Sequence, residues 1–111
     1  MPEPPEGQIP LSTATLYILL ALASNDLHGY GIMQEVAAHS AGKYKLGPGT
    51  LYDNLQKLVA TNLVELSPRQ DSDDPRRRYY RLTDFGKEVL AAEVRRLESV
   101  VHLARLRLES A

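Results

Sequence analysis

Cysteine and tryptophan are absent from this sequence of 111 residues, and phenylalanine occurs once. The lack of cysteine excludes disulfide frameworks, thiol catalysis and zinc sites of the cysteine type. Long apolar runs are also missing: the longest, residues 16–23, includes Tyr17 and is far shorter than the roughly 20 residues of a membrane helix. The N-terminus carries neither a basic nor an apolar stretch, so we expect no secretory signal, no membrane association and a cytoplasmic protein.

The charge is nearly balanced, at -1 for the whole chain, but it is unevenly distributed. Residues 43–81 hold eight Lys or Arg against five Asp or Glu, and the rest of the chain holds five against nine, so the middle of the chain is relatively basic and the rest is acidic on balance. Any surface that binds a polyanion must therefore be local. The hydrophobic share of 43% is ordinary for one globular domain.

The hydrophobic pattern predicts a mainly α-helical protein with a small β-hairpin. Residues 1–10 hold four of the seven prolines and are expected to form a disordered tail. Apolar residues at helical spacing predict helices over 12–24, 28–42 and 47–61, with Ser12 as a cap and Asn62 in a left-handed conformation. Alternation predicts strands over 63–67 and 77–82, and a last helix of about 25 residues, about 38 Å long, follows Thr83.

Three short helices followed by a hairpin form the arrangement of a winged helix-turn-helix. We therefore expect this domain over residues 11–82 and a C-terminal dimerisation helix over 83–111. In that arrangement the third helix enters the DNA major groove, and the hairpin, or wing, lies along the backbone or a minor groove. An isolated hairpin is marginal in water, so the wing must lean on the helices.

The third helix carries polar side chains suited to base and phosphate contacts. Thr50, Asn54 and Lys57 share its predicted outward face. Threonine can bind phosphate or a thymine methyl, asparagine can bind adenine, and lysine can bind phosphate or guanine. Tyr52 lies between the two faces, and Asp53 is unfavourable near DNA unless it accepts from a cytosine amino group.

Residues 76–81, Arg-Arg-Arg-Tyr-Tyr-Arg, are the densest basic run of the chain. Strand alternation predicts that Tyr80 and Leu82 face the core and that Arg77, Tyr79 and Arg81 face outward. Arg76 or Arg77 is expected to enter a minor groove while the other arginines neutralise phosphates. The acidic tip, which includes Asp71 and Asp73, would pair with some of them.

A heptad pattern runs along the last helix and predicts a homodimer, because the rest of the chain offers too little surface to cover so long a helix. Its members are Leu90, Val94, Leu97, Val101, Ala104 and Leu108.

Nothing in the sequence favours an enzyme, a metal site or a cofactor. The three histidines, His28, His39 and His102, lie on separate elements without ligand spacing or a patterned acid. His28 is expected to pack at a helix start.

Several of these segments resemble the PadR family of bacterial transcriptional regulators, in its short subclass with a single C-terminal helix. The matching segments are Thr15-Leu16-Tyr17-Ile18-Leu19, His28-Gly29-Tyr30-Gly31-Ile32, Gly49-Thr50-Leu51-Tyr52, Asn62-Leu63-Val64 and Arg78-Tyr79-Tyr80-Arg81-Leu82-Thr83. The resemblance implies a homodimer that binds a palindromic operator in double-stranded DNA, usually to repress, with release by a small-molecule effector in many members. It implies DNA contacts by Thr50, Tyr52, Asn54, Lys57, Arg76 and Arg77, and phosphate contacts by Tyr44 and Lys45.

Two positions depart from the family pattern. Asn62 stands where glycine is common and keeps the left-handed conformation available. Asp53 stands where proline is common and places a carboxylate near the DNA face, so the usual operator preference is not carried over. A second function stays open: a winged-helix module that binds protein and not DNA, which the low net charge and the acids at positions 53, 71, 73 and 74 would favour.

Overall fold

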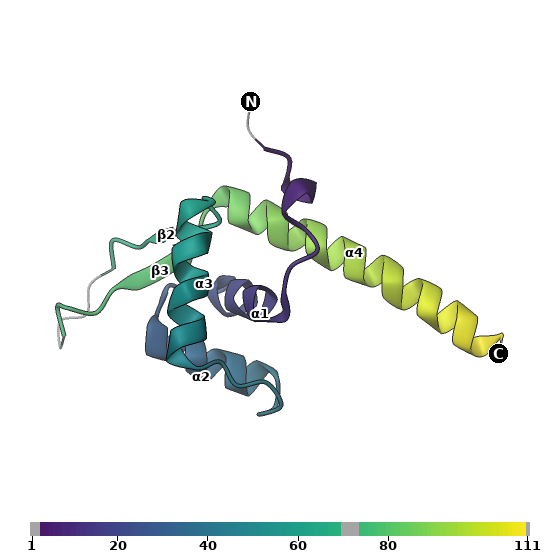
Figure 1. Cartoon of the computed structure of the whole chain (residues 1–111), viewed down its shortest axis with the longest axis horizontal. Coiled ribbons are helices and arrows are strands. Elements are labelled where there is room, and N and C mark those ends of the chain that lie inside the picture. The colour runs from purple at the N-terminus through teal and green to yellow at the C-terminus, as the bar shows by residue number, and fades with distance from the viewer. Residues whose placement is uncertain (1–2, 70–73, 111) are drawn as a thin grey trace.

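A computed structural model describes residues 3–69 and 74–110, which form a helical body, a small sheet and one projecting helix (Figure 1). The fold class confirms the prediction, and each predicted helix is found with its ends shifted by a few residues. The wing comprises β2, β3 and the described residues between them. The elements in chain order are η1 (Pro5–Gln8), α1 (Thr13–Leu22), β1 (Leu27–His28), α2 (Gly29–His39), α3 (Pro48–Ala60), β2 (Val64–Leu66), β3 (Tyr79–Leu82) and α4 (Asp84–Glu109).

One apolar core joins α1, α2 and α3, and it fixes the rotation of α3 about its own axis. Leu51, Leu55 and Leu58 of α3 are 0%, 2% and 5% exposed. Their spacing of four and three places them on one side of the helix. They belong to the same buried cluster as Ile18 of α1 and Ile32 of α2, so the opposite side of α3 is turned to solvent.

The ends of the helices follow the caps expected from the sequence. The hydroxyl of Ser12 accepts from the backbone N–H of Thr15, and the hydroxyl of Thr83 accepts from that of Gly86. Asn62, after α3, adopts the left-handed conformation with a φ of 65°. His28 lies at the start of α2, as expected, where its Nδ1 accepts from the N–H of Gly31.

The sheet has three antiparallel strands in the order β1-β3-β2, where the sequence predicted a two-stranded hairpin. Leu27 and His28 form the short β1 and pair with Tyr80 and Tyr79. The strand predicted over 77–82 begins at Tyr79. The sequence did not predict β1, because a strand of two residues is too short to show an alternating pattern.

The predicted outward orientation of Tyr79 on the wing is wrong. The sequence placed it outside, but it is 6% exposed. Its ring meets the ring of His28 edge-on, with centroids 5.3 Å apart, and the Arg69 guanidinium lies 4.6 Å from its centroid. The added strand and Arg69 therefore cover a position that would face solvent in an isolated hairpin.

The N-terminal segment also differs from the predicted disordered tail over residues 1–10. Residues 5–8 form the 3₁₀ turn η1, which lies along α4, and Ile9 packs against the core (Figure 1). The backbone N–H of Leu11 donates to the Glu93 carboxylate at 2.7 Å. Glu93 is 1% exposed, and its other oxygen accepts from Arg96. A buried acid on α4 thus binds the start of the chain.

Gly86 allows α4 to begin against the backbone of Leu63, the residue before β2. A Cβ at this position would overlap the carbonyl oxygen of Leu63, which also accepts a hydrogen bond from the N–H of Thr83 at 3.1 Å. Since both partners are backbone, the contact cannot relax by a side-chain rotation.

We therefore predict that Gly86→Ala lowers the free energy of unfolding by about 3 kcal/mol through overpacking. The matched control is Gly49→Ala, because no atom lies within 4 Å of a Cβ at Gly49; it is expected to raise stability by about 0.5–1 kcal/mol. Urea denaturation of the two variants checks both values. Equal stability of Gly86→Ala and the wild type would show that the contact is not constraining.

The Glu93 carboxylate is expected to make stability depend on pH. The pKa of Glu93 lies below its ordinary value of 4.5, mainly because of the hydrogen bond with Arg96. Burial raises this pKa, and the hydrogen bond from the Leu11 N–H lowers it further. A folded pKa below the unfolded one contributes stability at neutral pH that is lost as the pH falls through the acid range. The difference in unfolding free energy between wild type and Glu93→Gln should therefore shrink from neutral pH to about pH 3, as measured by urea denaturation. A difference that is constant with pH would contradict this role.

Candidate nucleic-acid interface

The solvent face of α3 is defined by the burial of its opposite side. Asp53, Gln56 and Lys57 are exposed and occupy its centre, while Thr50 is exposed at one flank. Tyr52, 50% exposed, lies at the other flank, toward the wing. A carboxylate, an amide and an ammonium group therefore stand together on the outermost part of the helix. All three can bind a base edge, and the amide and the ammonium group can also bind a phosphate.

Asn54 differs from the sequence prediction of a free outward side chain. It is half-buried, and its Oδ1 accepts from the hydroxyl of Thr15 on α1 at 3.1 Å. Its Nδ2 donates to the carbonyl oxygen of Thr50 at 2.8 Å. A bidentate contact with adenine needs both amide atoms, so this amide would first have to leave α1. In the structure Asn54 joins α3 to α1.

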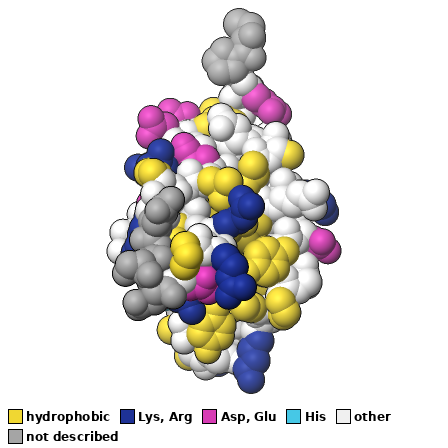
Figure 2. Space-filling model, turned by 90° about the vertical axis from the view of Figure 1, so that its left-hand side faces the viewer, with side chains coloured by type: hydrophobic (Ala, Val, Ile, Leu, Met, Phe, Trp, Pro, Cys, Tyr) yellow, Lys and Arg dark blue, Asp and Glu magenta, His cyan; other side chains and the backbone are white. Residues whose placement is uncertain are grey.

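A hollow of about 350 Å³ separates the start of α2, α3 and the wing. Three arginines and one aspartate line it together with tyrosines, so its charge is positive. Figure 2 shows Lys and Arg side chains standing among apolar ones on this side of the molecule. The lining residues are His28, Gly29, Tyr30, Tyr52, Asp74, Arg76, Arg77, Arg78 and Tyr80.

Tyr52 reaches into this hollow across Gly29. A Cβ at Gly29 would overlap the Tyr52 hydroxyl, so this close approach requires glycine. Burial first, and then the neighbouring Tyr52, raises the pKa of Tyr80, while Arg78 acts in the opposite direction. Tyr80 therefore stays protonated at neutral pH, and its hydroxyl can donate a hydrogen bond.

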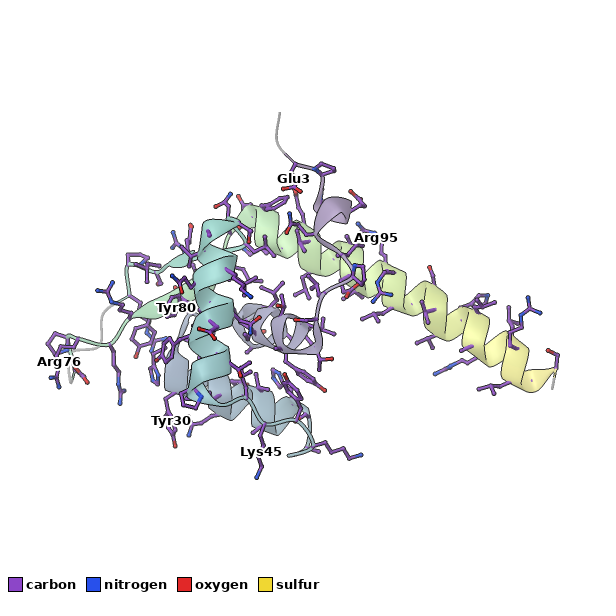
Figure 3. The ribbon with its side chains drawn as sticks, viewed as in Figure 1. Glu3, Tyr30, Lys45, Arg76, Tyr80 and Arg95 are labelled. Atoms are coloured by element: carbon purple, nitrogen blue, oxygen red, sulfur yellow. The ribbon has the colours of Figure 1, made fainter. Side chains whose placement is uncertain are left out.

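The arginines of the wing are partly paired with acids, as the sequence led us to expect. Arg76 and Arg77 place their Nε atoms 3.4 and 4.0 Å from the two carboxylate oxygens of Asp74. The side chain of Arg76 is 91% exposed and stands at the outer end of the wing (Figure 3). Ion pairs this exposed are weak and screened by salt, so a phosphate can compete for these guanidinium groups. Asp71 and Asp73 lie outside the described residues.

The two residues predicted before α3 are placed very differently. The ring of Tyr44 stacks on the ring of Tyr17, with centroids 5.2 Å apart and planes 14° apart, so it packs against α1. Lys45 is exposed and points away from the helices (Figure 3). Of this pair, Lys45 is the one placed to meet a phosphate.

Gln56 is a candidate that the sequence did not suggest, and Arg78 was expected only as one of the arginines that neutralise phosphates. Gln56 lies opposite the buried leucines, a position that the helical period alone could have identified. Arg78 is exposed and lines the hollow on the same side of the wing as Tyr80. Strand alternation places Arg78 on the same face as Tyr80, a face that was expected to point toward the core.

The predicted heptad pattern of α4 divides into a packed start and an exposed remainder. Leu90 is buried in its own domain, and Leu97 is half-buried. Val94, Val101 and Leu108 are 39%, 47% and 75% exposed, and Ala104 is exposed as well. Figure 1 shows this half of α4 projecting away from the body. An apolar stripe of this length in solvent is typical of an interaction surface.

Among residues 3–69 and 74–110, no three His, Cys, Asp or Glu side chains are grouped so that they could hold a metal ion. Within the same ranges, every helix is too short or too polar to cross a lipid bilayer.

Known proteins share both the sequence and the fold. The sequence pattern of the transcriptional regulator PadR-like family matches residues 18–92. Transcriptional regulator Rv3488 of Mycobacterium tuberculosis is 38% identical over 85 residues, which cover 77% of this chain and 76% of that protein.

Solved structures extend the comparison to the arrangement of the helices. A PadR family regulator from Clostridium difficile R20291 matches with a TM-score of 0.72 and 26% identity, over 87% of this chain and 99% of that one. Bacillus subtilis PadR, solved in complex with operator DNA, matches in fold with a TM-score of 0.66 and 22% identity, over 78% of this chain and 48% of that one. With more than half of the chain matched and a relative this similar, the protein belongs to the PadR-like family of transcriptional regulators, which are not enzymes.

Proposed function

We propose that this protein binds a palindromic DNA operator as a homodimer, with α3 in the major groove and the wing on the adjacent backbone. The observation that carries this proposal is the exposed polar face of α3 beside the arginine-lined hollow. Base-reading and phosphate-neutralising groups then lie next to each other, as a winged helix requires. Bacillus subtilis PadR, which has a similar fold, was solved in complex with operator DNA, and this supports DNA as the partner.

The side chains divide into those that reach DNA and those that hold the surface in place. We assign base or phosphate contacts to Thr50, Tyr52, Gln56 and Lys57 of α3, to Lys45, and to Arg76, Arg77 and Arg78 of the wing. Asn54 and Tyr44 hold α3 and its preceding loop against α1, through Thr15 and Tyr17. Asn54 keeps one unused N–H that can add a contact.

The second copy is proposed to cover the apolar stripe of α4. A DNA-binding protein with nearly balanced charge increases its affinity by doubling its phosphate contacts. Burial of the exposed apolar side chains between Val94 and Leu108 would stabilise the dimer. Two-fold symmetry then matches the protein to a palindromic site.

Regulation by this dimer is proposed to be repression, because two subunits in successive grooves exclude other proteins from the same DNA. Release by a small-molecule effector stays a prediction from the resemblance. The proposal implies a cytoplasmic location, where a bacterial chromosome lies.

Salt dependence of DNA binding tests the proposal. The purified protein selects duplexes from a randomised library, and the affinity for an enriched duplex is then measured by fluorescence anisotropy at increasing salt. We expect a steep loss of affinity. Lys45→Ala should weaken binding to all duplexes and reduce the log–log slope by about one unit for each bound subunit, whereas Lys87→Ala on α4 should leave it unchanged.

An affinity that is flat in salt, or a library from which no sequence is enriched, would overturn the proposal. Either result would favour the alternative of a protein-binding winged helix.

Dimerisation is tested separately by Val101→Glu. A carboxylate buried against a second copy is costly, whereas Val101 is 47% exposed in the single chain, so the fold itself should be kept. Sedimentation is expected to show a dimer for the wild type and a monomer for this variant. The control Ser99→Glu adds the same charge on the side of α4 that faces away from Val101 and should remain dimeric; a dimer of Val101→Glu would exclude this surface.

A further inference from the structure

Asp53 occupies the centre of the face that α3 turns to solvent. It lies two residues from Leu51 and Leu55, almost opposite the buried side of the helix. Its side chain is exposed, and Gln56 and Lys57 follow it on the same face. If α3 enters a major groove, this carboxylate is brought close to the base edges.

Asp53 is also the only carboxylate in the sequence of α3. The side-chain oxygen of Asn54, its neighbour in sequence, accepts from Thr15 on α1. An ionised carboxylate has only acceptor atoms, so it can bind only base atoms that donate. Its negative charge is repelled by the phosphates unless such a donor compensates for the lost water.

Only two bases present a donor in the major groove, namely the amino groups of cytosine and adenine. In adenine the amino group is flanked by the N7 acceptor, whose lone pair would repel the second carboxylate oxygen. Cytosine has no acceptor on that side of its amino group. The chemistry of the groove therefore favours cytosine opposite Asp53, and the guanine paired with it suits the neighbouring Lys57.

We propose that Asp53 is a specificity-determining residue that selects a C·G pair in each half of the operator by accepting a hydrogen bond from the cytosine amino group. This inference rests on the proposed function. It assigns to the residue that departs from the family pattern the role of giving this protein its own operator.

The test compares selections from one randomised duplex library by wild type, Asp53→Ala and Asp53→Asn. Alanine removes the acceptor and favours the helix, so preference for cytosine at one position of each half-site should fall about tenfold. Asparagine, which can both donate and accept, should shift that position toward adenine. Glu88→Gln, which removes one exposed charge from α4, is the control and should keep the wild-type preference.

Each outcome is decisive. If Asp53→Ala binds all duplexes more tightly by the same factor and keeps the wild-type preference at every position, Asp53 only repels DNA and the inference is wrong. If the wild type enriches a palindrome without a cytosine that depends on Asp53, the inference fails while the proposed function stands. If the wild type enriches no sequence, both fail together.

Discussion

Burial of Leu51, Leu55 and Leu58 is the interaction on which the interface depends. Each buried leucine contributes about 1.5–3 kcal/mol relative to an exposed one, so turning α3 about its axis would expose several at once. This cost fixes which side chains of α3 face solvent. The polar face is therefore set by what the core excludes, and its centre falls on Asp53, Gln56 and Lys57.

The wing packs on the helical core through Val64 and Leu82, and further contacts hold its two edges. Leu63, at the base of the wing, is 1% exposed. Its carbonyl oxygen accepts from the N–H of Thr83 and lies against Gly86 at the start of α4. At its other edge the wing pairs with β1, where Tyr79 meets His28. The long helix and the wing thus share one backbone junction, so the surface for a second copy and the arginines for DNA are held in a fixed relation.

Charge is used locally in this protein. The chain as a whole is nearly neutral, yet three arginines border one hollow between α2, α3 and the wing. Two of these arginines, Arg76 and Arg77, pair with Asp74, and these ion pairs are exposed and therefore weak. Such pairs keep the guanidinium groups oriented without the large desolvation cost of a buried ion pair, so the groups can change partner when a phosphate arrives.

The sequence by itself determined the order of the helices, the caps at Ser12 and Thr83, the left-handed Asn62 and the buried side of α3, because these depend on neighbours within a few residues. Tertiary structure alone decided the inward turn of Asn54, whose partner Thr15 is 39 residues away, and the course of the N-terminal segment, which binds Glu93 across 82 residues. It also decided the burial of Tyr79, which needs a strand too short to leave a pattern. Local periodicity records which side of an element is apolar, but it carries no information about which distant side chain supplies a hydrogen bond or covers a ring.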